Sequence, residues 1–389
     1  MRKKIAILGS TGSIGKSLLN IVKTDSKSFE VVLLSAHKNY KELLKQSKTF
    51  NVRNLIVTDK KTYEYLTANS KYKKYQFFNN FYSFKKILKK KIDYTLSAIV
   101  GLDGLIPTIK IIKYSKTIAI ANKETIICGW NLIQNELKKY NTKFIPVDSE
   151  HFSVWSTLSS KTSNIEKIYL TASGGPFYKK KFEDLKNIKI SQALKHPTWK
   201  MGRKISIDSA TLINKIFEII EAKKIFNISY KKLSILIHPK SYVHAVLKYD
   251  NGIINIIAHE TTMAIPLSNS LYWGTKNKIK TSKINLENLN SLNFSFVNKT
   301  NFPLISIINK LPKKDSLFET VLVSANDYLV NLFLDKKITY TDICNLLIKI
   351  TNMKKFNKYK KITPFSISDI LKINHFTINE IKKLIKNVS

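Results

Sequence analysis

Short apolar runs and amphipathic stretches alternate along the first 150 residues of the chain. Apolar runs that predict buried strands lie at residues 4–8, 31–36, 54–58, 94–100, 117–121 and 143–147. Amphipathic patterns between them predict helices, for example at residues 17–22, 104–113 and 130–139. Strands that alternate with helices are typical of a parallel sheet covered by helices. We therefore predict an α/β fold that begins with a Rossmann-like, doubly wound domain over residues 1–148.

The rest of the chain predicts a mixed central part and a helical end. We expect a central α+β catalytic domain over residues 149–275, with a lid near residues 174–203, and an Asn- and Lys-rich linker over residues 276–300. Helical periodicity at residues 317–333, 338–349, 369–374 and 377–386 predicts a C-terminal helical bundle over residues 301–389. Suitable capping residues stand at Ser316, Thr341 and Thr377.

A glycine-rich turn links the first predicted strand to the first predicted helix. Gly9, Gly12 and Gly15 would let the backbone approach a pyrophosphate, and the following helix would supply N–H groups. A glycine turn without function is the alternative, although strand, turn and helix occur in the order that a dinucleotide site requires. The second strand ends at His37-Lys38-Asn39 and lacks the acidic residue of an NAD site. Because Lys38 suits a 2′-phosphate, the sequence favours NADP.

Composition and charge restrict the partners. The chain is 43% hydrophobic and carries 66 Lys and Arg against 27 Asp and Glu, a net charge of +39. These cations are spread along the chain and form no aromatic-interleaved basic motif, so we expect no nucleic-acid partner. We also expect no membrane partner, because no apolar run approaches 18 residues. Cys128 and Cys344 form neither a disulfide framework nor a zinc pattern, which predicts a cytoplasmic location.

Two carboxylates follow the last predicted strand of the first domain. Residues two apart in a strand share a face, so Asp148 and Glu150 are expected to converge at its carboxyl end. Such hard oxygen ligands suit Mg²⁺ or Mn²⁺ better than zinc. On a later predicted helix Glu218 shares a face with Asn214 and neighbours Lys215, which makes it a third candidate ligand. The competing interpretation is a solvated acidic turn and a salt-bridged helix surface.

Two further segments suggest ligand contacts. Ser173 stands beside Gly174 and Gly175 after an apolar run, where a hydroxyl and backbone N–H groups can meet a phosphate, although a plain turn has the same pattern. Residues 196–202, with Trp199 between Pro and Gly, have the composition of a loop that closes over a ligand. A surface loop anchored by Trp199 is the alternative.

These motifs, in this order, closely resemble the 1-deoxy-D-xylulose 5-phosphate reductoisomerase family over nearly the whole chain. The matching segments are residues 9–15, 121–124, 146–151, 173–177, 196–204, 208–211, 214–218 and 238–244. The resemblance implies rearrangement of 1-deoxy-D-xylulose 5-phosphate and its reduction by NADPH to 2-C-methyl-D-erythritol 4-phosphate, a step of non-mevalonate isoprenoid biosynthesis. It leaves retro-aldol and ketol-migration routes open, and it implies a homodimer.

The resemblance also implies roles for single residues. It implies that Asp148, Glu150 and Glu218 bind Mg²⁺ or Mn²⁺. It also implies that the catalytic residues are these three carboxylates, Lys123 and His196. Contacts to the phosphorylated sugar fall on Lys123, Ser149, Glu150, Ser173, His196, Ser209, Asn214, Lys215 and Glu218. Contacts to NADPH fall on Thr11, Gly12, Ser13, Ile14, Lys38, Asn39, Asn122, Glu124 and Gly202.

The chain departs from the family's pattern at three places. His37 and Ile216 stand where the family usually has glycine, and residues 259–266 lack its Pro-Asp-Met-Arg segment. We expect the last departure to lower stability or loosen a dimer without loss of catalysis. Two other functions compete with the reductoisomerase: another NADP-linked dehydrogenase, and a basic binding protein with a relic dinucleotide fold. Neither would need three converging carboxylates.

Overall fold

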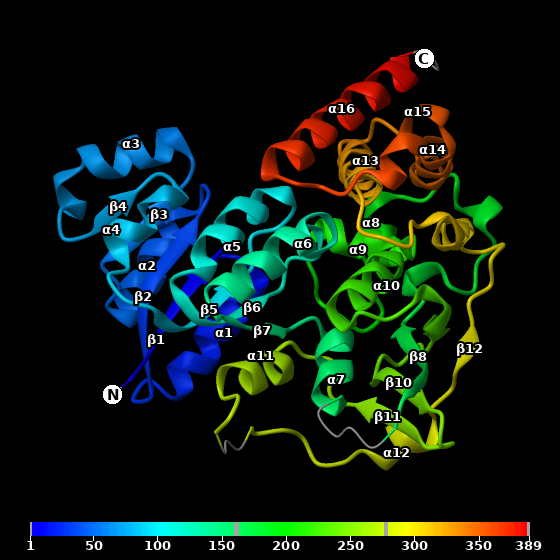
Figure 1. The fold of residues 1–389 in the computed structure, drawn as a ribbon, viewed down its shortest axis with the longest axis horizontal. Helices are drawn as coiled ribbons and strands as arrows, with labels where there is room; N and C mark the ends of the chain where they lie inside the picture. Colours follow the sequence, from blue (N-terminus) through cyan, green and yellow to red (C-terminus); the bar gives the residue numbers. More distant parts are fainter. Residues whose placement is uncertain (1, 159–162, 276–278, 387–389) are drawn as a thin grey trace. The chain divides into compact units, whose positions relative to one another are not determined.

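The computed structural model describes residues 2–158, 163–275 and 279–386 (Figure 1). Its contacts divide the chain into two compact units. Unit 1 contains the chain up to Thr125, Asn131–Asp148 and Met263–Ile279, and unit 2 contains Ile126–Trp130, Ser149–Thr262 and the chain from Lys280. Met1, residues 159–162 of the predicted catalytic domain, residues 276–278 of the predicted linker and residues 387–389 of the predicted helical domain lie outside the described residues.

A seven-stranded parallel sheet forms the framework of unit 1. Its order is β4-β3-β2-β1-β5-β6-β7, so the strands run outward from β1 in both directions, which confirms the predicted doubly wound fold. The strands are β1 (Lys3–Leu8), β2 (Phe29–Ala36), β3 (Asn54–Val57), β4 (Gln76–Phe78), β5 (Ile92–Ser97), β6 (Ser115–Ile120) and β7 (Lys143–Pro146). Continuous apolar runs such as Ile5–Leu8 are fully buried because both faces of the sheet are covered. β4 was not predicted, because its three residues are too few to show a pattern.

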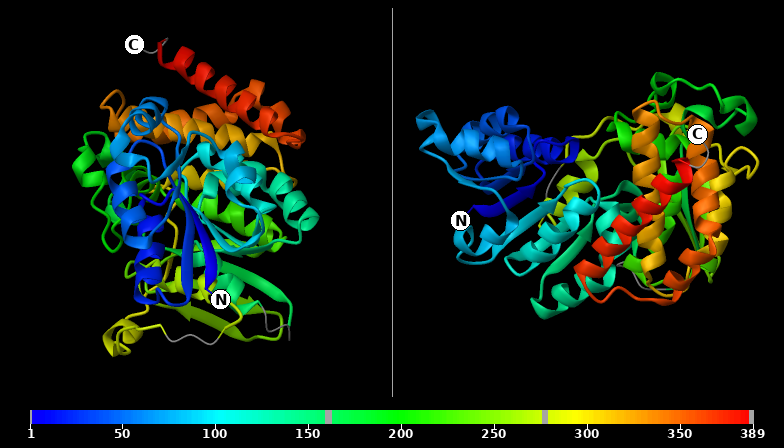
Figure 2. Two further views of the ribbon diagram at one scale, coloured as in Figure 1. Left: turned by 90° about the vertical axis from the view of Figure 1, so that its left-hand side faces the viewer. Right: turned by 90° about the horizontal axis from the view of Figure 1, so that it is seen from above.

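Helices flank the strands of this sheet (Figure 2). They are α1 (Ser13–Thr24), α2 (Tyr40–Phe50), α3 (Lys60–Ala68), α4 (Phe84–Ile87), α5 (Leu105–Ile112), α6 (Lys123–Lys139) and α11 (Ala264–Leu271). Short 3₁₀ turns, η1 (Ser70–Tyr72), η2 (Phe81–Ser83) and η3 (Leu102–Gly104), complete the connections. α6 is kinked at Gly129, and its residues Ile126–Trp130 belong to unit 2.

Helix α11 lies in unit 1, although we predicted residues 149–275 as one catalytic domain. Leu267 and Leu271 enter the apolar core of unit 1. The Tyr94 and Ser270 hydroxyls lie 2.7 Å apart, and the Tyr272 hydroxyl donates to Asp25 at 2.7 Å. The apolar face of α11 predicts a buried helix, but nothing in its sequence indicates which core it joins.

Unit 2 contains a five-stranded mixed sheet of order β11-β10-β8-β9-β12, in which only β8 and β9 are parallel among the described strands. Its strands are β8 (Ile165–Ala172), β9 (Leu233–Ile237), β10 (Val243–Tyr249), β11 (Ile254–Ala258) and β12 (Ser295–Phe296). The nearby helices are α7 (Ser149–Thr157), α8 (Ile190–Ala193), α9 (Arg203–Ala210), α10 (Ile213–Phe226) and α12 (Leu286–Asn290). The 3₁₀ turns are η4 (Gly175–Phe177), η5 (Phe182–Leu185), η6 (Tyr230–Lys232) and η7 (Pro303–Lys310). β12 and α12 lie within the predicted linker, so that segment is partly built into the sheet.

The C-terminal part of unit 2 is helical, as predicted. It contains α13 (Leu317–Leu334), α14 (Tyr340–Asn352), α15 (Lys354–Asn357), η8 (Lys358–Lys361) and α16 (Ile367–Lys386), and α13 packs against α14 and α16. Ser316 caps α13 as expected, but Thr339 rather than Thr341 caps α14. The predicted helix start at Thr377 is wrong. Without Gly or Pro to interrupt it, α16 continues through that residue, which lies on its buried face.

Among the described helices, α13 alone is long and apolar enough to cross a membrane by length and composition. However, 78% of it is buried inside the protein. This burial is typical of the core helix of a globular unit.

Candidate active site

The turn after β1 has the backbone geometry of a dinucleotide site. Gly9 takes a φ of +81°, and a Cβ there would lie 2.6 Å from the Ala98 carbonyl oxygen. A Cβ at Gly15 would lie equally close to the Gly9 carbonyl oxygen. Both positions therefore require glycine. Gly12 caps α1 without a side chain, which leaves the first N–H groups of this helix for an anion.

Residues after β2 make the next predicted cofactor contacts. Lys38 is exposed, and its ammonium lies 3.8 Å from Asp59, which follows the neighbouring strand β3. Asn39 caps α2 by accepting a hydrogen bond from the Glu42 N–H at 3.3 Å. His37 contacts the Thr58 hydroxyl at 2.9 Å without a positive φ, so the backbone does not require the family's glycine there. The contact with Asp59 was not predicted, because it depends on the pairing of β2 with β3.

Asn122, Lys123 and Glu124 begin α6 after β6, and all three are buried. The Asn122 side chain accepts from the Thr125 N–H at 2.7 Å and donates to the Ile99 and Gly101 carbonyls. Its amide therefore holds the loop after β5. The Lys123 ammonium donates to the carboxylate of Asp148, which follows β7. Unit 1 thus brings these two predicted catalytic groups together at the carboxyl ends of neighbouring parallel strands.

The expected strand geometry of Asp148 and Glu150 is wrong. β7 ends at Pro146 and α7 begins at Ser149, so Glu150 lies in the first turn of a helix. The Ser149 hydroxyl donates to the Glu150 carboxylate. Asp148 is the last residue of unit 1, and in the sequence only Ser149 separates it from Glu150.

Lys215 on α10 bridges two carboxylates of unit 2. Its ammonium lies 2.5 Å from Glu150 and 2.5 Å from Glu218, and Lys215 and Glu218 are almost fully buried. Burial acts to lower the pKa of Lys215, but the two carboxylates outweigh burial and raise its pKa above the usual value. Lys215 is therefore charged. Oxygens of Glu150 and Glu218 lie within 4.8 Å of one another, close enough for both to bind one cation.

Asn214 and His151 fix the position of Glu218. Asn214 donates to the Glu218 carboxylate at 2.6 Å, while its own side-chain oxygen is buried and has no partner in the described structure. The ring of His151 contacts the Glu218 backbone carbonyl at 2.9 Å. Leu212, just before α10, takes a φ of +64°, a strained conformation that sets where this helix begins. The roles of His151 and Leu212 were not predicted, because the sequence pattern shows neither backbone conformation nor long-range contacts.

Ser173 and His196 form a second group in unit 2. The Ser173 hydroxyl lies 2.9 Å from Nε2 of His196. Nδ1 of His196 accepts the backbone N–H groups of Thr198 and Trp199, so Nε2 carries the proton of the neutral ring and donates to Ser173. Burial, and secondarily the charge of Lys215, lowers the pKa of His196 to about 4.

A close packing contact joins this group to α9. Gly175 takes a φ of +66°, and a Cβ there would lie 3.0 Å from the carbonyl oxygen of Ser209, at the end of α9. Gly202 caps the start of that helix. In the predicted lid, Trp199 makes an edge contact with His244, which stacks on His259 with ring centroids 3.7 Å apart. This stack was not expected, because His259 belongs to the segment that departs from the family's pattern.

Comparison with known protein families decides the relationship. Models of the 1-deoxy-D-xylulose 5-phosphate reductoisomerase, of its C-terminal domain and of a further DXP reductoisomerase C-terminal domain match residues 5–129, 144–226 and 259–378. The 1-deoxy-D-xylulose 5-phosphate reductoisomerase of Pelagibacter ubique is 55% identical over 385 residues, which cover 98% of this chain and 99% of that protein. The chain belongs to the 1-deoxy-D-xylulose 5-phosphate reductoisomerase family. The resemblance that the motifs indicated is confirmed.

Other reductoisomerases are also similar to this chain in sequence and structure. That of Clostridium novyi is 35% identical and covers 95% of this chain and 96% of that protein. The crystal structure of a DOX-P reductoisomerase in complex with NADPH, fosmidomycin and magnesium is 27% identical, with a TM-score of 0.89 over 99% of both chains. The Zymomonas mobilis reductoisomerase in complex with NADPH is 28% identical, with a TM-score of 0.86 over 99% of both chains.

The donor set of this reductoisomerase fits a hard divalent cation. Glu150 and Glu218 supply carboxylate oxygens, Asp148 stands two residues before Glu150, and no cysteine lies among them. The ammonium of Lys215 lies between Glu150 and Glu218. The two carboxylates therefore stabilise a positive charge at this position. The individual roles of these residues stay predictions.

Proposed function

We propose that this reductoisomerase converts 1-deoxy-D-xylulose 5-phosphate to 2-C-methyl-D-erythritol 4-phosphate with NADPH and a divalent metal ion. The observation that carries the proposal is the partly buried Glu150–Lys215–Glu218 cluster in a chain of this family. A relative of closely similar fold binds NADPH, fosmidomycin and magnesium together. Another NADP-linked dehydrogenase would not need such a cluster.

Asp148, Glu150 and Glu218 are the residues that would hold the metal ion. When bound, Mg²⁺ or Mn²⁺ would supply Lewis-acid polarisation of the substrate's carbonyl and hydroxyl oxygens. Oxygen ligands serve both ions, and magnesium is the ion found with the relative.

The chain's own residues supply positive charge and fixed hydrogen bonds. Lys123 and Lys215 hold ammonium groups beside the carboxylates, where they stabilise negative charge on a bound substrate. Ser173, Ser209, Asn214 and Lys215 would contact the sugar and its phosphate. The unpartnered Asn214 oxygen supports this role because it can accept a substrate hydroxyl.

His196 positions the substrate and is not the general base. At pH 7 its ring is neutral, Nδ1 is occupied by two backbone N–H groups and Nε2 donates to Ser173. A proton acceptor needs a free basic nitrogen, and His196 has none in this arrangement. Its contacts keep the Ser173 hydroxyl oriented.

The cofactor is held by the turn after β1 and by Lys38. The close approaches at Gly9 and Gly15 and the uncapped start of α1 support pyrophosphate binding there. The exposed Lys38 supports recognition of the 2′-phosphate. This assignment agrees with the NADPH found in the Zymomonas mobilis relative.

Turnover is tested by following the oxidation of NADPH by its absorbance, with 1-deoxy-D-xylulose 5-phosphate as substrate. We expect oxidation with Mg²⁺ or Mn²⁺ and none after chelation by EDTA, with recovery when metal is returned. Aspartate semialdehyde serves as the control substrate for the competing dehydrogenase. Metal-independent oxidation, or turnover of the control substrate alone, would contradict the proposal.

We also infer a cytoplasmic homodimer. Both cysteines are buried free thiols, which supports a reducing location. β11 is an edge strand of the unit 2 sheet, and Ile254 and Ile256 on it are about half exposed, at 55% and 50%. An apolar edge strand favours pairing with a second copy. Sedimentation analysis tests this: the wild type should sediment as a dimer and Ile256→Lys as a monomer, whereas a monomeric wild type would contradict it.

A further inference from the structure

A basic pocket lies at the amino edge of the unit 1 sheet. Its volume is about 670 Å³, and it is bordered by the first residues of β1, β3, β5 and β6 and by the loop after α4. The cofactor turn follows the opposite end of β1. Five residue steps separate Lys3 from Leu8, so the two ends are about 16 Å apart at 3.3 Å per step. The pocket is therefore distinct from the proposed cofactor site.

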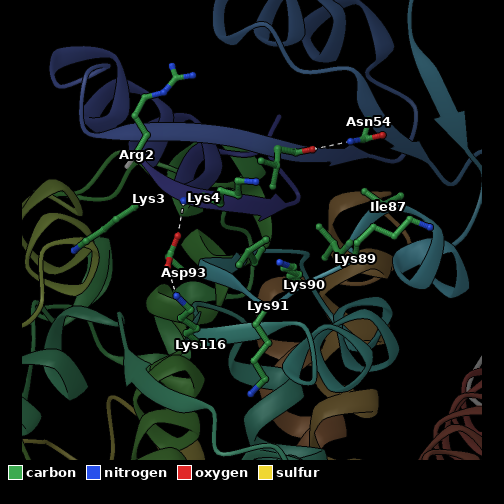
Figure 3. A pocket seen from close by; sticks show the side chains of 13 residues that line it. Arg2, Lys3, Lys4, Asn54, Ile87, Lys89, Lys90, Lys91, Asp93 and Lys116 are labelled. Atoms are coloured by element: carbon green, nitrogen blue, oxygen red, sulfur yellow. Dashed lines mark hydrogen bonds and ion pairs between the residues drawn. The ribbon is translucent and has the colours of Figure 1, made fainter.

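Cations line this pocket far more densely than the rest of the chain. Seven of its 13 lining residues are Lys or Arg, against 66 of 389 in the whole sequence. Figure 3 shows Lys4 and Lys90 near its centre, with Arg2 and Lys89 extending outward on opposite sides. Val32, Leu88 and Ile92 contribute apolar surface. The general lysine richness of the chain does not by itself produce this concentration.

Most of these cations have no protein partner. Asp93, the one acidic residue of the pocket, accepts from the Lys116 ammonium at 2.8 Å and from the Lys4 backbone N–H at 2.8 Å. Lys91 donates to the Tyr140 carbonyl. The charge of Lys3 also acts on Asp93. Among the described residues, no hydrogen bond or ion pair engages the side chains of Arg2, Lys4, Lys89 and Lys90. Lys4 and Lys90 thus bring two positive charges to the centre of the hollow, with Arg2, Lys3 and Lys89 around it, an arrangement that an anion would stabilise.

We infer that this pocket binds a small molecule that carries two or three linked phosphates. A single phosphate would meet only part of this charge, whereas a linked chain of phosphates can reach side chains from both β1 and the Lys89–Lys91 loop. The volume is that of a small-molecule site. The pocket would give the enzyme a second anion site, separate from the one that holds NADPH.

Isothermal titration calorimetry with inorganic triphosphate tests this site on the full chain. The titration is done without metal, at 150 mM salt, a concentration with a Debye length of about 8 Å, and with saturating NADPH to fill the cofactor site. We expect one triphosphate per chain. Lys4→Gln/Lys90→Gln should weaken this binding at least about tenfold, because two charge-assisted hydrogen bonds to the phosphates are lost. NADPH affinity should not change.

The control removes the same charge elsewhere. Lys45 and Lys48 are exposed on α2, outside the pocket, and Lys45→Gln/Lys48→Gln should change triphosphate affinity less than about twofold. Arg2→Gln/Lys89→Gln replaces the first pair should that variant fail to fold. Equal weakening by the pocket and control pairs, or binding without a fixed stoichiometry, would show attraction to the net charge alone and overturn the inference. Absence of triphosphate binding would overturn it as well.

Discussion

At the scale of single residues, Lys215 determines the electrostatics of the candidate site. It holds together the buried carboxylate of Glu218 and the partly buried carboxylate of Glu150, which would otherwise repel one another. The spacing along α10 predicted that Lys215 neighbours Glu218. It did not predict the contact with Glu150, because 65 residues separate the two and only the fold brings them together.

We predict that Lys215→Gln lowers the free energy of unfolding by about 3 kcal/mol in EDTA, because it leaves two close carboxylates without their cation. Excess Mg²⁺ should restore part of this loss, since a divalent ion can replace the ammonium. Urea unfolding with and without Mg²⁺ measures both effects. Lys248→Gln, which breaks an exposed pair with Glu166, is the control and should cost far less, because water screens an exposed ion pair. Equal losses of Lys215→Gln in EDTA and in Mg²⁺ would contradict the account.

The buried histidines predict a pH dependence of stability. Burial is the main cause that lowers the pKa of both His196 and His244 from 6.5 to about 4. Between these values the unfolded chain binds more protons than the folded chain, so stability is full above pH 6.5 and is lost as the pH falls towards 4.

His244→Gln should remove part of this slope, up to about 3 kcal/mol between pH 6.5 and 4. Urea unfolding across that range measures it. The same change at His375, an exposed residue of α16, serves as the control. Identical slopes for wild type and His244→Gln would show that His244 is not held neutral by the fold.

At the scale of elements, the start of α13 combines a helix cap with a buried ion pair. Glu319 accepts from the backbone N–H and the hydroxyl of Ser316, at 2.7 and 2.8 Å. Its carboxylate also lies 3.3 Å from the buried ammonium of Lys224 on α10. The cap therefore joins α13 to α10, which carries the candidate metal ligand Glu218.

Glu319→Ala should cost about 3 kcal/mol of unfolding free energy, because it removes the cap and leaves Lys224 buried with fewer acidic partners. Asp342→Ala removes the equivalent cap residue of α14, where no lysine is paired with it among the described ion pairs, and should cost about 1 kcal/mol. Thermal and urea unfolding of both variants compare them. Equal costs would mean that the Lys224 contact adds nothing to the cap.

Element boundaries show which signals the sequence carries. The strands of unit 1 were predictable because they are buried on both faces and form continuous apolar runs. Thr377 resembled a helix cap, although it lies inside α16, because capping preferences are weaker than the packing of a long amphipathic helix. β12 was missed because two residues carry no periodicity, and its pairing with β9 depends on distant chain.

At the scale of the whole molecule, the excess lysines are unevenly distributed. Most of the lysines are dispersed, but one group surrounds the pocket at the amino edge of the unit 1 sheet. The ordered motifs indicated the family and the candidate residues over nearly the whole chain, and the comparisons confirm the family. The grouping of α11 with unit 1 and the His244–His259 stack were not predictable, because they depend on contacts between distant segments.

The metal dependence of turnover in Glu218→Gln tests the central claim most directly. NADPH oxidation with 1-deoxy-D-xylulose 5-phosphate is measured over a range of Mg²⁺ concentrations, with Glu166→Gln on β8 as the matched control. We predict that Glu218→Gln loses at least about a hundredfold in turnover because a metal ligand is lost, while its NADPH affinity and the turnover of Glu166→Gln stay near wild type. Near-normal turnover of Glu218→Gln at low Mg²⁺ would contradict the assignment of Glu218 as a metal ligand.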